Sequence, residues 1–223
     1  MINSTLSEAL LNAIQDPSKY GVPHLNFLFW QEADDHAKQV YLAQYRDNPV
    51  LRQFFQERYY APDYDFESLA ELPPATLGYV FYHHLTDNGL DPKLLTNYKA
   101  FQEAEDAAGK LPNMPDEIKY STVRGFQTHD ILHAVTGMTT SPLGEIRLQA
   151  FGLAQSPNVY NAFWMSMLTT SSAFLNPQQI DPFMDAITTG WQLGRRAKSL
   201  SVVHWEEMFD QPLAELQREY NLI

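Results

Sequence analysis

Two histidines and two carboxylates that lie close together in the sequence could bind a metal ion. His129 and His133 are four residues apart in the segment HDILH, Asp130 directly follows the first histidine, and Glu145 comes twelve residues after the second. In a helix, residues four apart lie on the same face, so both imidazoles would point the same way, with Asp130 at the flank. Imidazole nitrogens and carboxylate oxygens bind divalent metals. The pattern therefore predicts a metal site formed by His129, Asp130, His133 and Glu145.

The residues between HDILH and Glu145 predict a turn between two helices. Gly137 is typical of a helix C-terminus, and Ser141 followed by Pro142 is typical of a helix N-terminus. Glu145 would then lie about one turn inside the second helix. A helix–turn–helix of this kind can fold the glutamate back toward the two histidines, which is the arrangement that the metal site requires.

The ligand count indicates a catalytic site. Two histidines and one glutamate leave coordination positions open, as they do in catalytic zinc sites and non-haem iron sites. Asp130 could be a fourth ligand, a partner that orients an imidazole, or a general base. We therefore expect Asp130, His133 and Glu145 to take part in catalysis as well as in metal binding.

Other families of metal enzymes fit the segment less well. In the metalloprotease motif HExxH, the residue after the first histidine is a glutamate that activates water, and Asp130 is one methylene shorter. The HD dipeptide also occurs in metal-dependent phosphohydrolases, which take further ligands from distant helices. Five other histidines could supply such a ligand, although the sequence favours structural or surface positions for all of them: His24, His36, His83, His84 and His204.

The composition indicates a single globular domain spanning residues 1–223. The chain is 44% hydrophobic and carries a net charge of −12. Such an acidic chain is not expected to bind nucleic acid, because phosphate binding needs a basic surface. The sequence contains no cysteine, which excludes disulfides and cysteine-ligated zinc sites.

The N-terminal segment predicts neither a signal peptide nor a transit peptide. The first twenty residues contain no early basic residue and no continuous apolar stretch. No later segment offers about twenty unbroken apolar residues, so a membrane span is not expected. We therefore expect a cytoplasmic protein, with peripheral membrane contact at most.

Helical periodicity dominates the chain and predicts an all-α orthogonal bundle. Alternation with β-branched residues is almost absent. The stretch 92–109 is polar, and its helical periodicity is weak. Elsewhere, periodicity, capping residues and prolines predict helices over residues 6–14, 26–45, 50–59, 67–71, 74–88, 115–136, 142–155, 157–175, 177–200 and 212–220.

Two further features suggest how a substrate could bind. No charged residue lies between Arg147 and Asp181, so the helix in this stretch is either a buried core helix or the wall of an apolar lipid cavity. If it forms a cavity wall, the candidate lipid contacts are Phe163, Trp164 and Met167. Arg195 and Arg196 belong to the one compact basic cluster, which either favours a helix C-terminus or binds an anionic headgroup, carboxylate or phosphate.

Several segments resemble the Coq4 family of ubiquinone-biosynthesis proteins. The family's hallmark is HDxxH, an eleven-residue spacer and a glutamate, which here correspond to His129, Asp130, His133 and Glu145. Other segments are also similar to the family. They are LHAVTGM and LGEI near the motif, LAELPPATLGYVFYHHLTDNGLDP upstream of it, and the segments containing GRRA and WEE downstream. The resemblance covers residues 49–223, whereas residues 1–48 form divergent N-terminal helices.

The resemblance implies an all-α fold, a divalent metal usually described as zinc, an apolar cavity for a polyprenylated ring, peripheral membrane association and a homodimer. It also implies removal of the C1 carboxyl from a polyprenylated hydroxybenzoate precursor, with hydroxylation at that carbon. An oxidative reaction would favour iron, manganese or cobalt over zinc, which has no redox chemistry, and magnesium is a further candidate. Two alternatives are a lipid-binding scaffold that organises other quinone-biosynthesis enzymes, and a metal-dependent hydrolase of a phosphorylated isoprenoid.

Overall fold

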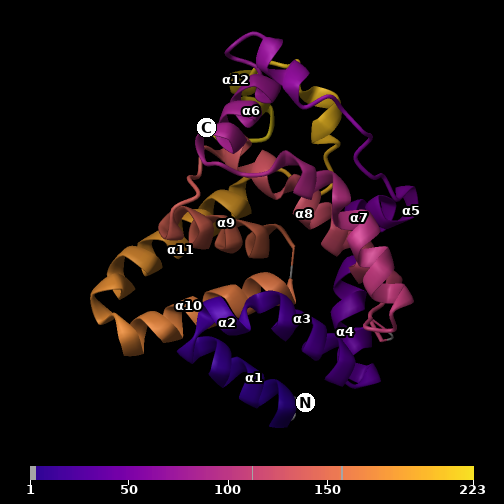
Figure 1. The fold of residues 1–223 in the computed structure, drawn as a ribbon, viewed down its shortest axis with the longest axis vertical. Coiled ribbons are helices and arrows are strands. Elements are labelled where there is room, and N and C mark those ends of the chain that lie inside the picture. The colour runs from indigo at the N-terminus through magenta and orange to yellow at the C-terminus, as the bar shows by residue number, and fades with distance from the viewer. Residues whose placement is uncertain (1–3, 112, 157) are drawn as a thin grey trace. The chain divides into compact units, whose positions relative to one another are not determined.

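The computed structural model describes residues 4–111, 113–156 and 158–223. Outside these ranges lie the first three residues, Pro112 and Pro157. The helix start that the sequence predicts at Pro157 therefore lies outside the described residues. Within them the chain forms α-helices and short 3-10 turns, with no β-strand (Figure 1). One isolated bridge joins Thr76 and Pro212. The all-α class expected from the sequence is confirmed, and the apolar lipid cavity stays a prediction.

The chain divides into two compact units. The first unit comprises Met1–Arg52, Leu111–Met114 and Ser141–Arg195, and the second comprises Gln53–Lys110, Pro115–Thr140 and Arg196–Ile223. The single domain expected from the composition stays a prediction.

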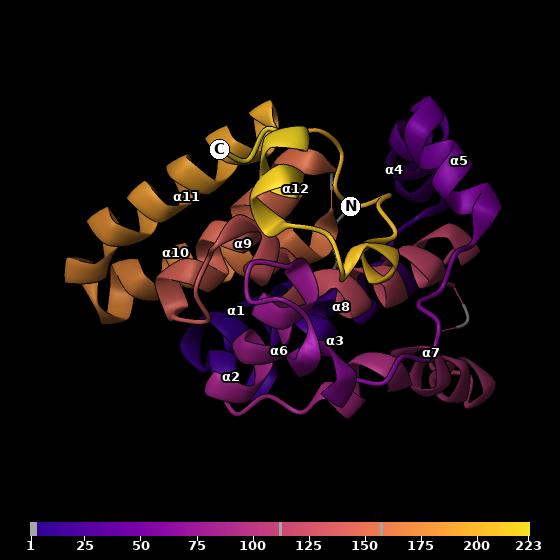
Figure 2. The ribbon, with the colours of Figure 1, turned by 90° about the horizontal axis from the view of Figure 1, so that it is seen from above.

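The first unit contains the N-terminal helices and the helices that follow the HDILH segment. They are α1 (Ser4–Gln15), α2 (Pro17–Tyr20), α3 (Val22–Glu32), α4 (Asp35–Arg46), α9 (Pro142–Gln155), α10 (Val159–Leu175) and α11 (Ile180–Arg196). A 3-10 turn at Pro177–Gln179 joins α10 to α11, and the two helices form a hairpin (Figures 1 and 2). Helix α5 (Pro49–Glu57) runs from the first unit into the second.

A side-chain cap divides a stretch that the sequence predicts as one helix. Asp34 Oδ1 accepts the backbone N–H of Ala37 at 2.7 Å, which satisfies a donor that has no partner inside the new helix. Helix α3 therefore ends at Glu32 and α4 begins at Asp35. The prediction of a continuous helix over residues 26–45 is wrong for this reason.

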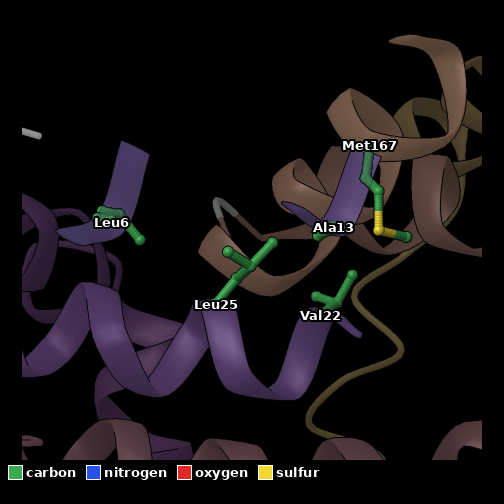
Figure 3. Close-up of a cluster of buried hydrophobic side chains, with 5 residues drawn as sticks. All are labelled: Leu6, Ala13, Val22, Leu25 and Met167. Atoms are coloured by element: carbon green, nitrogen blue, oxygen red, sulfur yellow. The ribbon is translucent and has the colours of Figure 1, made fainter. Parts of the chain in front are cut away.

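The core of the first unit lies where α10 packs with α1 and α3 (Figure 3). Five side chains that are at most 3% exposed form this cluster: Leu6, Ala13, Val22, Leu25 and Met167. Phe163 and Trp164, about one turn earlier on α10 than Met167, pack against the cluster and are part-buried. Phe174 and Leu175, at the C-terminal end of α10, are exposed, so the helix is buried along only part of its length.

The second unit is built around the 21-residue helix α8 (Asp116–Thr136). Its other elements are the 3-10 turn Glu67–Glu71, α6 (Leu77–Asp87), α7 (Pro92–Ala107), the 3-10 turn Trp205–Met208 and α12 (Leu213–Glu219). Helices α6, α7 and α12 all pack against α8. Helix α7 forms over a stretch whose periodicity in the sequence is weak.

The start of α6 pairs with the segment that precedes α12 (Figures 1 and 2). The backbone N–H of Leu77 donates to the carbonyl of Gln211 at 2.9 Å, and that of Leu213 donates to the carbonyl of Ala75 at 2.8 Å. These bonds satisfy backbone donors at the first turn of each helix, where no partner within the helix exists. They attach the C-terminal segment to α6.

A buried ion pair attaches α8 to the same C-terminal segment. Arg124, 2% exposed, donates from Nη1 and Nη2 to the two carboxylate oxygens of Glu206 at 2.8 and 3.2 Å. Nη1 also donates to Gln127 at 2.9 Å, and the guanidinium lies 5.0 Å from the centre of the Tyr59 ring. Burial and the negative charge of Glu206 raise the pKa of Tyr59 to about 12. This network fixes the helical turn of α8 that directly precedes His129 to the C-terminal segment.

Loss of the counter-charge should destabilise the second unit. In a Glu206→Gln variant Arg124 remains charged and buried, and breaking a buried ion pair in this way costs about 3–5 kcal/mol. We expect the free energy of unfolding in urea, followed by circular dichroism, to fall by about this amount. Arg124→Met combined with Glu206→Leu removes both charges and should recover most of the loss. A Glu206→Gln variant as stable as the wild type would contradict this account of the pair.

Candidate metal centre on helix α8

Helix α8 ends three residues after the second histidine because Gly137 turns the chain. Gly137 has a φ of +69°, in the left-handed region that glycine adopts without strain. Its N–H donates to the carbonyl of His133 at 2.9 Å, and the Thr136 hydroxyl donates to the carbonyl of Leu132 at 2.6 Å. Both bonds satisfy carbonyls of the last turn, and the sequence prediction of a helix end at Gly137 is confirmed.

The turn fixes the hydrogen-bonding state of the His133 ring. Nδ1 of His133 lies 3.0 Å from the carbonyl oxygen of Met138. A carbonyl oxygen can only accept, so Nδ1 carries the hydrogen, and in the neutral ring Nε2 is left with its lone pair. The His133 side chain is 1% exposed. A buried histidine held by a backbone carbonyl in this way has the orientation typical of a metal-ligating imidazole.

The lone pair of His133 points toward the other histidine of the motif. His133 Nε2 and His129 Nε2 are 3.3 Å apart, and the two rings are nearly perpendicular at 87°. Two nitrogens each about 2.1 Å from one tetrahedral ion would be about 3.4 Å apart. The geometry therefore fits two imidazoles that share one cation, and without a cation the same distance fits a hydrogen bond between the rings.

Asp130 adds an oxygen donor to this pair. One candidate ligand atom from each of His129, Asp130 and His133 lies within 4.8 Å of the other two. In the part of the chain that the structure describes, this is the one group of three such residues that could hold a metal ion. The structure therefore brings together three of the four predicted ligands.

Glu145, the fourth predicted ligand, lies on α9 in the first unit. Ser141 caps this helix, since its hydroxyl accepts the N–H of Gly144 at 3.2 Å, and the N–H of Glu145 donates to the carbonyl of Ser141 at 2.8 Å. The expected helix start at Ser141 and Pro142 is confirmed. The part of Glu145 in the metal site stays a prediction.

Two tyrosines that the sequence analysis did not single out lie within electrostatic reach of Asp130. Burial raises the pKa of Tyr64, and the charges of Glu206 and Asp130 raise it further. Burial and the charge of Asp130 also raise the pKa of Tyr98, whose ring stacks on Phe126 at 4.6 Å. Asp130 therefore contributes to the raised pKa of both phenols.

A third histidine, His84, lies beside the pair. Its ring centre is 5.3 Å from that of His133, and the planes are 18° apart. His84 comes from α6, and the sequence favoured a structural or surface position for it. No local pattern relates α6 to HDILH, so the contact could be found only once the packing of α6 on α8 was known.

The predicted substrate contacts fall into two groups. Phe163, Trp164 and Met167 lie together on α10 at the core of the first unit, with Met167 fully buried. Arg195 and Arg196 lie at the C-terminal end of α11, where Arg196 Nη2 donates to the carbonyl of Leu222 at 3.0 Å. Their roles in substrate binding stay predictions.

No helix in the described ranges combines the length and apolar character that crossing a membrane requires.

The model of the family "Coenzyme Q (ubiquinone) biosynthesis protein Coq4" matches residues 43–223, more than half of the chain. A crystal structure of a Nostoc punctiforme protein described as a ubiquinone biosynthesis protein superposes with a TM-score of 0.76, at 23% identity, over 97% of this chain and 94% of that one. This likeness supports the fold.

Curated relatives agree with the family model. The Ubiquinone biosynthesis protein COQ4 homolog of Nematostella vectensis is 27% identical over 196 residues, covering 83% of this chain and 85% of that protein. COQ4 homolog 1 of Culex quinquefasciatus is 25% identical over 165 residues, covering 71% of this chain but only 52% of the relative. The chain thus spans about half the length of some of these relatives.

Both relatives are named as mitochondrial proteins, which differs from the cytoplasmic location predicted from the sequence. The compartment of this chain stays a prediction. The family itself follows from the match over residues 43–223 and from the relatives that share it. The chain belongs to the Coq4 family of ubiquinone-biosynthesis proteins.

Proposed function

We propose that this chain is a metal-dependent enzyme of ubiquinone biosynthesis that removes the C1 carboxyl from a polyprenylated hydroxybenzoate precursor. One observation carries the proposal: His133 Nε2, its tautomer set by Met138, lies 3.3 Å from His129 Nε2. Family membership supplies the pathway, since the family is described as ubiquinone-biosynthesis proteins. The reaction at C1 and the prenylated substrate are what the family resemblance implies.

The cation would be held by His129 and His133 together with the carboxylates of Asp130 and Glu145. Glu145 is included because it occupies the position of the glutamate in the family motif, separated from HDxxH by eleven residues. Two imidazoles and carboxylates suit zinc, iron, manganese or cobalt, while magnesium prefers oxygen ligands. When bound, the cation supplies a Lewis acid that stabilises negative charge as the bond between C1 and the carboxyl breaks.

The chain's own residues then have distinct tasks. Met138 keeps the Nε2 lone pair of His133 available, and Asp130 either binds the cation or accepts a proton. Tyr64 and Tyr98 lie within electrostatic reach of Asp130, whose negative charge helps to raise the pKa of both phenols.

The chemistry at C1 has two balanced forms. Loss of CO2 with a proton in its place needs no other reactant. Replacement of the carboxyl by a hydroxyl needs dioxygen and two electrons from an external donor, with one oxygen atom entering the ring and the other leaving as water. The second form would favour a redox-active metal, since zinc has no redox chemistry.

Phe163 and Trp164, which are part-buried on α10, would contact the polyprenyl tail of the substrate. Arg195, which is exposed near the end of α11, would contact an anionic group of the substrate. Met167 and Arg196 are weaker candidates, because one is fully buried in the core and the other is bonded to a backbone carbonyl. Peripheral membrane contact, a homodimer and association with other quinone-biosynthesis enzymes belong to the same proposal.

Loss of a proposed ligand should strongly weaken metal binding while the fold survives. We expect His133→Ala and His129→Ala to weaken zinc or cobalt binding by more than roughly 10- to 100-fold, which is the cost of losing a residue that only orients a ligand. Calorimetric titration and elemental analysis measure the binding. His83→Ala is the matched control, because His83 is a partly exposed histidine of α6 whose Nδ1 lies 3.8 Å from a carboxylate oxygen of Asp87. Circular dichroism checks the fold. Equal affinity in all four proteins would refute the metal centre.

Turnover separates the enzyme from the scaffold and the hydrolase. Carboxyl-labelled polyprenyl-hydroxybenzoate should release labelled CO2 with the metal-loaded wild type, and Asp130→Asn should lower the rate by about 100-fold or more, the scale of a general base. Lipid binding should be unchanged in the variant. A wild type that binds the lipid without releasing CO2, and whose His133→Ala variant still supports biosynthesis, would favour the scaffold. Phosphate release from an isoprenoid phosphate would favour the hydrolase.

A further inference from the structure

The contact between His84 and His133 has a consequence for the metal centre. We propose that His84 is a positioning residue, whose ring holds the imidazole of His133 in the orientation that aims Nε2 at the cation. This role rests on the metal centre proposed above. It assigns a task to a histidine of α6 that the HDxxH motif does not include.

The two rings are nearly parallel and offset from one another. Their centres are 5.3 Å apart and their planes differ by 18°, which is the geometry of an offset stack. Helix α6 is held rigidly, because Leu77, Phe81 and Leu85 on it are fully buried. The backbone carbonyl of His84 also accepts a hydrogen bond from Asn88 at 2.7 Å. The ring of His84 is therefore presented from a fixed backbone.

This face contact complements the hydrogen bond at the ring edge. The Met138 carbonyl, 3.0 Å from Nδ1, holds one edge of the His133 ring. A ring stacked on the face of His133 restricts rotation about the bond between Cβ and the ring, which a single edge bond leaves partly free. With both contacts in place, Nε2 stays 3.3 Å from His129 Nε2. The ligand pair is then arranged before the cation arrives, which lowers the entropy cost of binding.

The same geometry argues against His84 as a ligand. A nitrogen lone pair lies in the plane of its own ring, so nearly parallel rings direct their lone pairs along separate planes and not toward one point. In the described part of the chain, the group of donors close enough to share an ion contains His129, Asp130 and His133, without His84. His84 acts through His133, and only its flat ring is needed.

The neighbouring residue provides a control. His83 is on the same helix, but its side chain is 42% exposed and lies 3.8 Å from Asp87. Its ring contacts Tyr79, with the centres 4.4 Å apart. Substitution of His83 therefore removes a histidine from α6 without removing the contact with His133.

Cobalt binding to the full chain tests the proposal without reference to turnover. Co2+ is titrated into wild type, His84→Ala, His84→Leu, His84→Phe and His83→Ala, while the visible absorption bands of the bound ion are recorded. We expect His84→Ala and His84→Leu to bind Co2+ roughly 10- to 100-fold more weakly, which is the loss typical when a residue that orients a metal ligand is removed. The absorption bands of the bound ion should also change. His84→Phe keeps a flat ring and should stay within about threefold of wild type with the same bands. His83→Ala should match wild type.

The outcomes are distinguishable. His84→Leu fills the volume that alanine leaves empty, and thermal unfolding verifies that each variant is folded. Wild-type affinity and bands in both His84→Ala and His84→Leu would overturn the positioning role alone. A His84→Phe variant as weak as His84→Ala, with bands that indicate a lost nitrogen donor, would make His84 a ligand and overturn it too. A wild type that binds no Co2+ would overturn the metal centre and the role of His84 with it.

Discussion

The hydrogen bond between His133 Nδ1 and the carbonyl of Met138 is the constraint on which the candidate site depends. It exists because Gly137 adopts a left-handed conformation and reverses the chain just after α8. A residue with a Cβ would adopt this conformation only at a cost of about 1 kcal/mol. The turn that ends the helix is thus also the device that selects the tautomer of a proposed metal ligand.

The remainder of the second unit keeps α8 in place around that turn. Arg124 and Glu206 form a fully buried ion pair, although 82 residues separate them in the sequence. Near the other end of the helix, Gln217 Nε2 donates to the carbonyl of Val135 at 2.9 Å. The C-terminal segment therefore supports the helix on both sides of the two histidines. Changes in this segment would act on the site through the position of α8.

Local features of the sequence predicted much of this arrangement. The spacing of His129 and His133, the glycine at the end of α8 and the Ser141 cap of α9 each depend on residues a few positions apart, and the structure agrees with all three. Helical periodicity likewise predicted the all-α class. These are properties that a single helix or turn determines by itself, so no knowledge of packing was needed.

Other features arise only from packing between elements. His84 meets His133 because α6 packs on α8, and nothing in the segment around His84 indicates that neighbour. Asp34 divides a stretch whose apolar spacing alone suggested one helix. Helix α7 has a polar sequence, so its periodicity gave little signal even though a helix forms there. In each case the deciding partner lies on another element, or a polar cap outweighs the apolar pattern.

X-ray absorption spectroscopy of the zinc-loaded protein near neutral pH tests the central claim most directly. The account predicts a first shell of nitrogen and oxygen at about 2.0–2.1 Å, with the outer-shell scattering of two imidazole rings. A first shell of oxygen alone, without imidazole scattering, would show that His129 and His133 do not share the ion, and would contradict the account.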